Sequence, residues 1–206
     1  MSYLNNNYII KNMGQYTSVW KSCEKYLRAR KNDIHIPLSY HWCQKLLTKY
    51  KEADQDVCSL AIILHDIGWY CIDIEKIIKD GFRSKNYLQS KVRFMHEKEG
   101  VKLSKVILKK NNWEKEIIYD VCDIIDGHDT RNYPKSLNDR IVRDADKLWR
   151  YSVTGIAIAS DWLGVTPSEY IRKLNIQKNK LETEYGYELA LKELEISKEN
   201  LMAHII

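Results

Sequence analysis

The pair His65-Asp66 places two side chains that can bind metal at the end of an apolar run, Leu60 to Leu64. Burying an imidazole and a carboxylate is costly unless each is paired or bound to a metal. A second pair, His128-Asp129, follows another apolar segment. The dipeptide alone is therefore weak evidence, and the metal chemistry that it predicts depends on what the fold brings beside it.

Further histidines and aspartates lie on or next to apolar helical stripes of the central region. They are His41, His96, His128, Asp144 and Asp146. Helical bundles build metal sites from inward side chains on facing helices. Imidazole and carboxylate ligands together suit Fe, Mn, Co, Ni or Zn better than Ca. We expect His35 and His204 to be ordinary core or surface histidines.

The elements that must position these side chains are all predicted to be helices. Few Gly and Pro residues interrupt the chain, and apolar residues recur at helical spacing. Ser39 and Asp54 are candidate N-caps, and Thr166 to Glu169 forms a capping box with Pro167. The expected helices cover residues 18–30, 40–50, 54–67, 90–110, 113–126, 137–158, a segment from 166, and the charged segment after 175.

This pattern predicts an all-α fold with one domain over residues 1–206. The motif-bearing core spans about 37–150, and a C-terminal helical extension about 166–206. The 206-residue length and 44% hydrophobic content suffice for a buried core.

Composition limits the partners and the compartment. The net charge of +5 is spread over interleaved acidic and basic residues, so no specific nucleic-acid binding is indicated. A small phosphorylated substrate is compatible with this charge. Five cysteines without a Cys-x-x-Cys motif are expected to be reduced thiols. No segment has the pattern of a leader or a membrane span, so we expect a cytoplasmic protein.

The order of these residues resembles the HD superfamily of metal-dependent phosphohydrolases. The resemblance rests on His41, His65-Asp66 and the segment Asp144-Ala145-Asp146-Lys147-Leu148. It implies a helical bundle with a divalent transition metal. The last metal-binding aspartate of the family lies in an Ala-Asp-x-Leu context, which selects Asp146, whereas periodicity alone does not rank Asp144 and Asp146.

His96 and His128 resemble the extra ligands of the two-metal subgroup of this superfamily. By that resemblance, His41, His65, Asp66 and Asp146 would hold the first ion. Asp66, His96 and His128 would hold the second, with Asp66 as the bridge. A mononuclear centre without His96 and His128 is the alternative. The stretch from His128 to Pro134 lacks the paired histidine and Gly-Tyr-Pro of cyclic-dinucleotide phosphodiesterases, so that activity is not expected.

The resemblance implies hydrolysis of a phosphoester or phosphoanhydride of a nucleotide or small metabolite by metal-activated water. We assign catalytic roles to Asp66 and to Lys147, a cation beside Asp146. Other candidate cations are Arg83, Lys91, Arg93 and Arg131, each of which would more often be a surface charge. Glu97 is expected to be an exposed helix charge rather than a support for His96. Trp69 and Trp149 are expected in the core, although either could stack a nucleobase.

Two other classes of function share this pattern. Di-iron oxygenases that cleave C–C or C–P bonds have the same order of ligands, and a metal-stabilised binding module is a further alternative.

Overall fold

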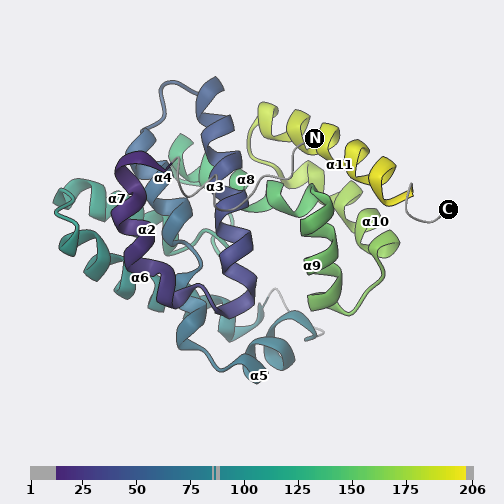
Figure 1. The fold of residues 1–206 in the computed structure, drawn as a ribbon, viewed down its shortest axis with the longest axis horizontal. Helices are drawn as coiled ribbons and strands as arrows, with labels where there is room; N and C mark the ends of the chain where they lie inside the picture. The colour runs from purple at the N-terminus through teal and green to yellow at the C-terminus, as the bar shows by residue number, and fades with distance from the viewer. Residues whose placement is uncertain (1–12, 85, 87–88, 203–206) are drawn as a thin grey trace.

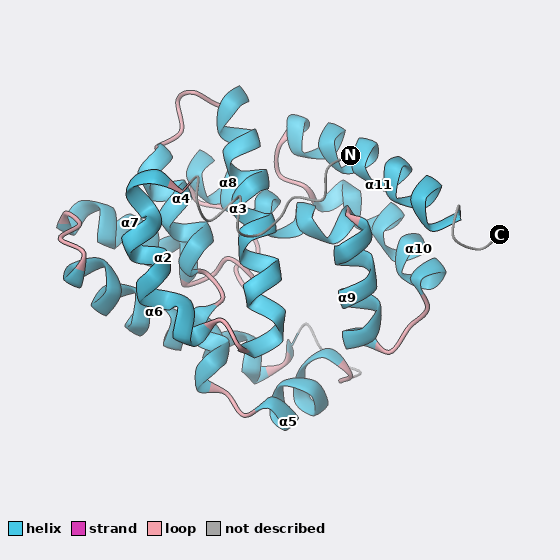
Figure 2. Ribbon diagram, in the orientation of Figure 1, coloured by secondary structure: helices cyan, strands magenta, loops and turns pink. Residues whose placement is uncertain are grey.

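The computed structural model describes residues 13–84, 86 and 89–202, and all regular elements within these residues are helical (Figure 2). The predicted all-α fold is therefore confirmed. The longer helices are α2 (Thr17–Cys23), α3 (Asn32–Lys49), α4 (Gln55–Leu64), α6 (Lys91–Lys110), α7 (Lys115–Ile125), α8 (Leu137–Leu148), α9 (Val153–Leu163), α10 (Pro167–Gln177) and α11 (Glu184–Met202).

Short helical turns join these helices. They are η1 (Gly14–Tyr16), η2 (Glu24–Tyr26), η3 (Ala29–Lys31), η4 (Ile67–Cys71), α5 (Ile74–Lys76), the π-helical turn η5 (Ile77–Phe82), η7 (Trp149–Tyr151) and η8 (Lys178–Lys180). The predicted helix over 18–30 ends at Cys23 and continues only as such turns. The predicted helix over 137–158 is broken at η7, where the Ser152 side chain accepts a hydrogen bond from Gly155 N and starts α9.

The start of α3 differs most from the prediction. The helix begins at Asn32 instead of Tyr40, and Pro37 lies inside it. Ser39, expected to be an N-cap, is a buried residue in the helix interior. Proline lacks a backbone N–H and usually marks a helix start, so Pro37 suggested that the helix begins after it. The packing of α3 against α4 and α8 instead continues the helix through Pro37. Because α3 begins eight residues earlier than predicted, it includes His35 as well as His41.

Two other N-caps are confirmed. The Asp54 carboxylate accepts a hydrogen bond from Val57 N at 2.9 Å and starts α4. Thr166 and Glu169 form the reciprocal capping box at the start of α10. Such caps satisfy backbone N–H groups that the helix itself leaves without partners.

The larger hydrophobic core draws on residues from Met13 to Leu194, and Trp69, Ile72, Ile77 and Val92 form a second, smaller cluster. Figure 1 shows α2, α4, α6 and α7 on one side of the molecule and α9, α10 and α11 on the other. Helix α3 packs against both α4 and α8, and α11 packs against α8. The two ends of the described chain are therefore joined through α3 and α8, which carry two of the site residues described below.

A close backbone contact joins η4 to α6. A Cβ atom on Gly68 would lie 2.0 Å from the carbonyl oxygen of His96 and 2.4 Å from the amide nitrogen of Gly100. Only glycine lets two backbones approach so closely. This contact sets η4, directly after His65-Asp66, against the turn of α6 that carries His96.

All five cysteines are free thiols, and only Cys71 is exposed. Within the described residues, no single helix is long and apolar enough to cross a membrane. One pair, Gln55–Cys71 with Ile74–Gly81, passes that test jointly, but it is bent by 108°.

Candidate metal centre

Six buried side chains converge between the helices, although they are far apart in the sequence. His65 and Asp66 follow the last residue of α4, and His128 follows the end of α7. The other three lie within helices: His35 on α3, His96 on α6 and Asp146 on α8. All six are between 0% and 7% exposed, so little of the cluster is in contact with bulk water.

The first half of the cluster joins α3, the end of α4 and α8. His35 Nε2 lies 2.9 Å and His65 Nε2 3.3 Å from Asp146 Oδ1. The two Nε2 atoms are 3.1 Å apart. Asp66 Oδ2 completes this half at 3.7 Å from His65 Nε2.

The second half uses the other oxygen of Asp66. Its Oδ1 lies 3.4 Å from His96 Nε2 and 3.6 Å from His128 Nε2. The two Nε2 atoms of these histidines are 3.4 Å apart. Asp66 therefore turns one carboxylate oxygen toward each half of the cluster, and it is the residue that the two groups of possible ligands share.

Backbone carbonyls orient two of the imidazoles. His65 Nδ1 lies 2.8 Å from the carbonyl oxygen of Ile62, and His128 Nδ1 lies 3.0 Å from that of Ile125. A carbonyl only accepts, so each Nδ1 carries the proton and each Nε2 is directed into the cluster. Both contacts arise because these histidines follow helix ends, where carbonyl groups lack helical partners.

Burial keeps two other imidazoles neutral near pH 7. It lowers the pKa of His35 to about 4 and that of His96 to about 3. Burial also opposes the charge of His128, but the hydrogen bond to Asp66 and the charge of Glu97 raise the pKa of His128 to about 10. Despite their burial, Asp66 and Asp146 have pKa values well below the usual range, because His65 and Arg30 lie near Asp66 and Arg150 lies near Asp146.

Three residues hold Asp66 in place. Its carboxylate accepts hydrogen bonds from Arg30 Nη1 at 3.2 Å and from Trp69 Nε1 at 2.9 Å, and its carbonyl accepts one from Asn32 Nδ2 at 3.0 Å. The Arg30 guanidinium also stacks over the Trp69 ring. Arg30 and Lys31 have left-handed backbone conformations, with φ of 53° and 54°. This conformation is costly for residues other than glycine, and here it brings a buried cation to Asp66.

Five of the six predicted ligands lie together in the cluster. The sixth, His41, does not. His41 is partly buried on α3 and packs edge-on against Trp42. Residues six apart on a helix lie about 9 Å apart along the axis and about 120° apart around it. His35 and His41 therefore face different directions, and His35, which we expected to be an ordinary histidine, reaches the cluster. His204 lies outside the described residues.

The structure separates Asp144 from Asp146. Asp146 faces His35 and His65, as described above. Asp144 instead accepts hydrogen bonds from Glu182 N at 2.8 Å, Thr183 N at 2.9 Å and Thr183 Oγ1 at 2.7 Å. Its role is thus to hold the segment that leads into α11.

The predicted cations differ in where they lie. Lys147 and Arg93 line a pocket that also includes His128 and Asp146. Lys147 donates to the carbonyl of Lys180 at 2.7 Å, and Arg93 pairs with Asp129 at 3.0 Å.

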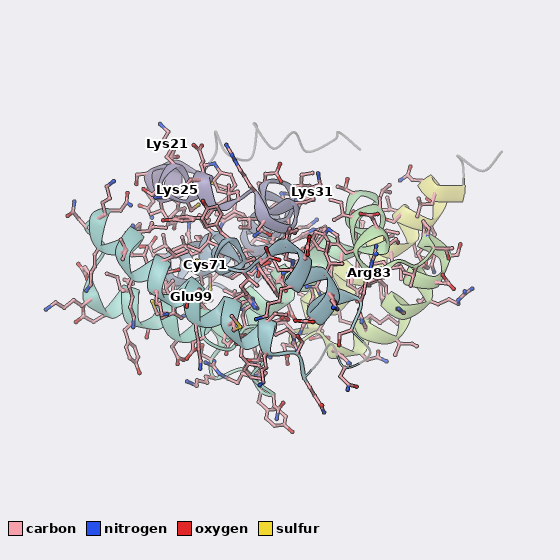
Figure 3. The ribbon with its side chains drawn as sticks, turned by 90° about the horizontal axis from the view of Figure 1, so that it is seen from below. Lys21, Lys25, Lys31, Cys71, Arg83 and Glu99 are labelled. Carbon is pink, nitrogen blue, oxygen red and sulfur yellow. The ribbon has the colours of Figure 1, made fainter. Side chains whose placement is uncertain are left out.

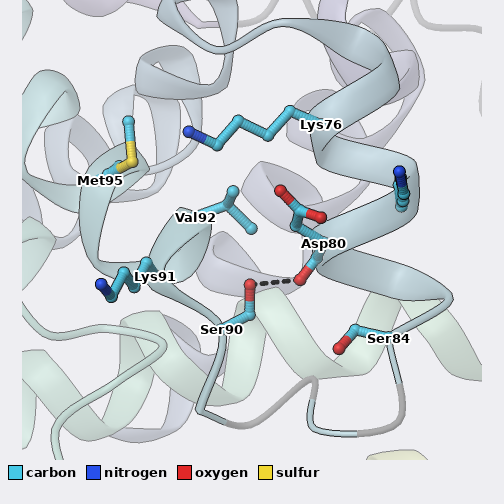
Figure 4. Close-up of a pocket in the computed structure, with 8 residues that line it drawn as sticks. Lys76, Asp80, Ser84, Ser90, Lys91, Val92 and Met95 are labelled. Carbon is cyan, nitrogen blue, oxygen red and sulfur yellow. Dashed lines mark hydrogen bonds between the residues drawn. The ribbon is translucent and has the colours of Figure 1, made fainter.

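The remaining candidate cations do not line this pocket. Arg131 pairs with Asp139 at 2.9 Å and fixes the loop after α7. Lys91 lines a separate surface pocket between η5 and the start of α6 (Figure 4), in which Ser90 donates to the Asp80 carbonyl. Arg83 is exposed (Figure 3).

Glu97 is buried, which corrects the expectation of an exposed charge. Its carboxylate accepts hydrogen bonds from the backbone of Asp129 and Thr130 at 2.9 and 3.0 Å. It thereby fixes the loop that carries His128, whose Nδ1 lies 3.9 Å from Glu97 Oε1.

The two tryptophans lie in the core, as expected, but they also contact the cluster. Trp69 stacks on the His96 ring, with centroids 4.1 Å apart. Trp149 packs on the His35 ring at 4.6 Å. Both are fully buried, so in this structure neither offers an open face to a nucleobase.

The spacing of these atoms fits divalent transition metals. Ligand atoms about 2.0–2.2 Å from one ion lie about 3–3.6 Å from one another in octahedral or tetrahedral arrangements. Most of the separations within each half fall in that range. Asp146 Oδ1 is buried without a hydrogen bond of normal geometry, although two imidazole nitrogens lie within 3.3 Å. Lone pairs that face a common point in this way are expected of a metal centre.

Residues 33–150 match the family model of the HD domain. The match covers more than half of the chain and contains all six clustered residues. This chain belongs to the HD domain family. The match begins two residues before His35, so it includes the histidine that the fold places in the cluster. Searches of the curated proteins and of the solved structures found no match.

Sequence reasoning missed two residues of the centre. His35 could have been found from its apolar neighbours Ile34 and Ile36, which mark a buried position. The residues around Arg30 in the sequence give no comparable indication that it is buried. Its position depends on the two left-handed residues before α3, which local composition does not predict.

Proposed function

We propose that this protein is a metal-dependent phosphohydrolase with a two-metal centre. The observation that carries the proposal is the orientation of Asp66, whose two oxygens face two separate sets of histidines. His35, His65, Asp66 and Asp146 would hold one ion. Asp66, His96 and His128 would hold the other.

The chemistry of the ligands supports this proposal. Four imidazoles and two carboxylates suit Fe, Mn, Co, Ni or Zn. When bound, such ions lower the pKa of a coordinated water and polarise a phosphoryl oxygen. Two divalent ions would leave the centre with a positive charge, because Asp66 and Asp146 are its only carboxylates among the described residues and already contact Arg30 and Arg150. An anionic substrate would balance that charge.

The residues of the chain have distinct tasks in the proposed reaction. Trp69, Arg30 and Asn32 keep Asp66 in position, and the carbonyl contacts of His65 and His128 fix the direction of their Nε2 atoms. Lys147 and Arg93 line the pocket beside His128 and Asp146. They would attract the anionic substrate, and Lys147 would support the negative charge that develops on it.

We further propose a phosphorylated small molecule as the substrate, either a nucleotide or a phosphorylated metabolite. We propose no nucleic-acid or membrane partner. A cytoplasmic location agrees with the five free thiols.

Elemental analysis of the purified protein, followed by a phosphoester screen, tests the proposal. The screen uses protein loaded with Mn, Fe, Co or Ni, with and without oxygen. We expect two ions per chain and hydrolysis that does not require oxygen. The Asp66→Ala variant is expected to lose the two ions and the activity. The His41→Ala variant, which changes a histidine outside the cluster, is expected to keep the two ions and the activity.

Other outcomes would contradict the proposal in distinguishable ways. Turnover that requires oxygen, with a mixed-valent iron signal, would indicate an oxygenase. Full metal occupancy without hydrolysis of any phosphoester would indicate a binding module. Wild-type metal content in Asp66→Ala would reject the metal centre itself.

A further inference from the structure

A pocket of about 230 Å³ opens beside the metal centre, where His128 and Asp146 form part of its wall. Another part comes from the end of α10 and from η8, through Leu174, Gln177 and Lys180. These three residues lie outside the segment that matches the HD domain. The pocket therefore combines a wall that belongs to the family match with a wall specific to the C-terminal part of this chain.

Basic side chains dominate the pocket. Five lysine or arginine side chains line it, against only two carboxylates, Asp129 and Asp146. The five basic residues are Arg93, Arg143, Lys147, Arg150 and Lys180. A concave surface with such an excess of one charge concentrates ions of the opposite sign.

Most of these cations are held by groups of the protein. Arg93 pairs with Asp129, and Arg150 lies 3.3 Å from Asp146 Oδ2. Arg143 Nε donates to the carbonyl of His128 at 3.1 Å. Lys147 donates to the carbonyl of Lys180 at 2.7 Å and lies 3.4 Å from Glu182 Oε1.

Lys180 differs from the other four cations. Its ammonium group has no hydrogen bond or ion pair with any residue that the structure describes, and its side chain is exposed. Its own carbonyl, which accepts from Lys147, ties η8 to α8 beside Asp146. The backbone of Lys180 is thus anchored at the pocket wall, and the charge of its side chain is available to a ligand.

The pocket is small and offers little to a nucleobase. Pockets for drug-sized ligands are typically about 300–1,000 Å³, which is larger than this one. Among the described residues that line it, Tyr151 is the only aromatic side chain besides His128, which belongs to the metal centre. Tyr151 is 2% exposed and donates to the carbonyl of Leu174. Trp69 and Trp149 are covered by His96 and His35, so they present no ring to the pocket.

From these observations we propose that the substrate is a compact molecule with two anionic groups. One is the phosphate that reacts at the metal centre, beside His128 and Asp146. The other, a phosphate or a carboxylate, is bound by Lys180, on the part of the wall that η8 contributes. This inference rests on the proposed phosphohydrolase function and makes Lys180 a specificity-determining residue of that site.

Non-hydrolysable probes test the inference without relying on turnover. We suggest calorimetric titration of the Mn²⁺-loaded full chain with propylphosphonate, propane-1,3-diphosphonate and 3-phosphonopropanoate. The first has one anionic group, the second has two phosphonates, and the third has a phosphonate and a carboxylate. The stronger binder of the last two identifies the second group. The variant is Lys180→Glu, and its control is Lys178→Glu, which makes the same change of charge in the same turn but outside the pocket lining.

We expect both two-anion probes to bind more tightly than propylphosphonate. Lys180→Glu should weaken their binding by about tenfold, as expected when a charged contact is lost and reversed. Lys180→Glu should weaken the binding of propylphosphonate much less. Lys178→Glu should have a small effect on the binding of all three probes. The inference is overturned if Lys180→Glu weakens one-anion and two-anion probes equally, or if Lys178→Glu has the same effect.

The outcome separates this inference from the proposed function. If the probes discriminate as expected but no phosphoester is hydrolysed, the phosphohydrolase assignment fails and the two-anion pocket stands. If phosphoesters are hydrolysed but Lys180→Glu does not discriminate between the probes, the inference fails and the assignment stands.

Discussion

At the scale of single residues, the centre depends on which histidine of α3 reaches it. His35 and His41 lie on one helix, but only His35 is fully buried and within 3.1 Å of His65. A ligand at that position contributes directly to metal affinity, because imidazole nitrogen is among the strongest protein donors to these ions.

This difference gives a paired prediction. We expect His35→Ala to weaken binding of the ion at His65, Asp66 and Asp146 by more than about 100-fold, since even residues that only support ligands contribute about 10–100-fold. His41→Ala, on the same helix, should keep the wild-type affinity. Titration of the metal-free variants with Mn²⁺ measures both effects. Equal losses in the two variants would contradict the placement of His35 in the centre.

The same pair shows how far the sequence could predict the site. The apolar segments around His65, His96, His128 and Asp146 showed that these residues face inward, because helical periodicity is visible in the sequence. The choice between His35 and His41 depended on where α3 begins. Pro37 suggested a boundary, whereas the packing of α3 against α4 and α8 carries the helix through it. Local signals do not contain that tertiary contact.

At the scale of elements, the contact between η4 and α6 sets the distance between Asp66 and His96. Gly68 lies against the backbone of His96 and Gly100, with no room for a Cβ atom. A Cβ on Gly100 would lie 3.3 Å from the side chain of Ile125, 3.5 Å from the His65 carbonyl oxygen and 3.7 Å from Gly68 N. The two glycines therefore differ in what a methyl group would displace.

We predict that Gly68→Ala destabilises the protein by about 2 kcal/mol, since overpacking forces backbone shifts. Gly100→Ala should be close to neutral, because alanine favours a helix by about 1 kcal/mol over glycine and offsets the contact with Ile125. Thermal unfolding of the metal-free proteins measures both. Gly68→Ala should also weaken metal binding at His96, which Mn²⁺ titration reports. This account would be refuted if Gly100→Ala lowered the stability as much as Gly68→Ala does.

Helix α8 supports both the metal centre and the C-terminal helices through two aspartates on different faces. Asp144 is fully buried and satisfies the backbone before α11, while Asp146 faces the histidines. The sequence did not rank these two, because both lie on apolar stripes of the same helix. The partners that separate them come from residues 182 and 183 and from α3, far away in the chain.

We predict opposite effects for the two substitutions. Asp144→Ala should lower the free energy of unfolding by about 3 kcal/mol, because buried donors lose a charged acceptor, and the protein should still bind two ions. Asp146→Ala should lose the ion held by His35 and His65. Chemical denaturation and elemental analysis of both variants provide the comparison. Loss of metal from Asp144→Ala at a temperature where it remains folded would show that the roles are reversed.

At the scale of the whole molecule, the centre links elements that are distant in the chain. Its ligands come from α3, the ends of α4 and α7, α6 and α8, so a bound ion would connect most of the bundle. The unfolded chain cannot hold these side chains in one place. A ligand that binds only the folded state stabilises it by mass action.

We therefore predict that metal raises the thermal stability of the whole protein. At a free concentration of 100 times the dissociation constant, one ion contributes about 2.7 kcal/mol. For a chain of this length, 1 kcal/mol corresponds to about 2–4 °C in Tm, so one Mn²⁺ ion should raise Tm by about 5–11 °C and a chelator should reverse the change. Calorimetry with Mn²⁺ and with a chelator measures the shift. In Asp66→Ala, which lacks the residue common to both halves, the shift should disappear. A shift of the same size in that variant would mean that the stabilising ions bind elsewhere, because no other described residue joins the two sets of histidines.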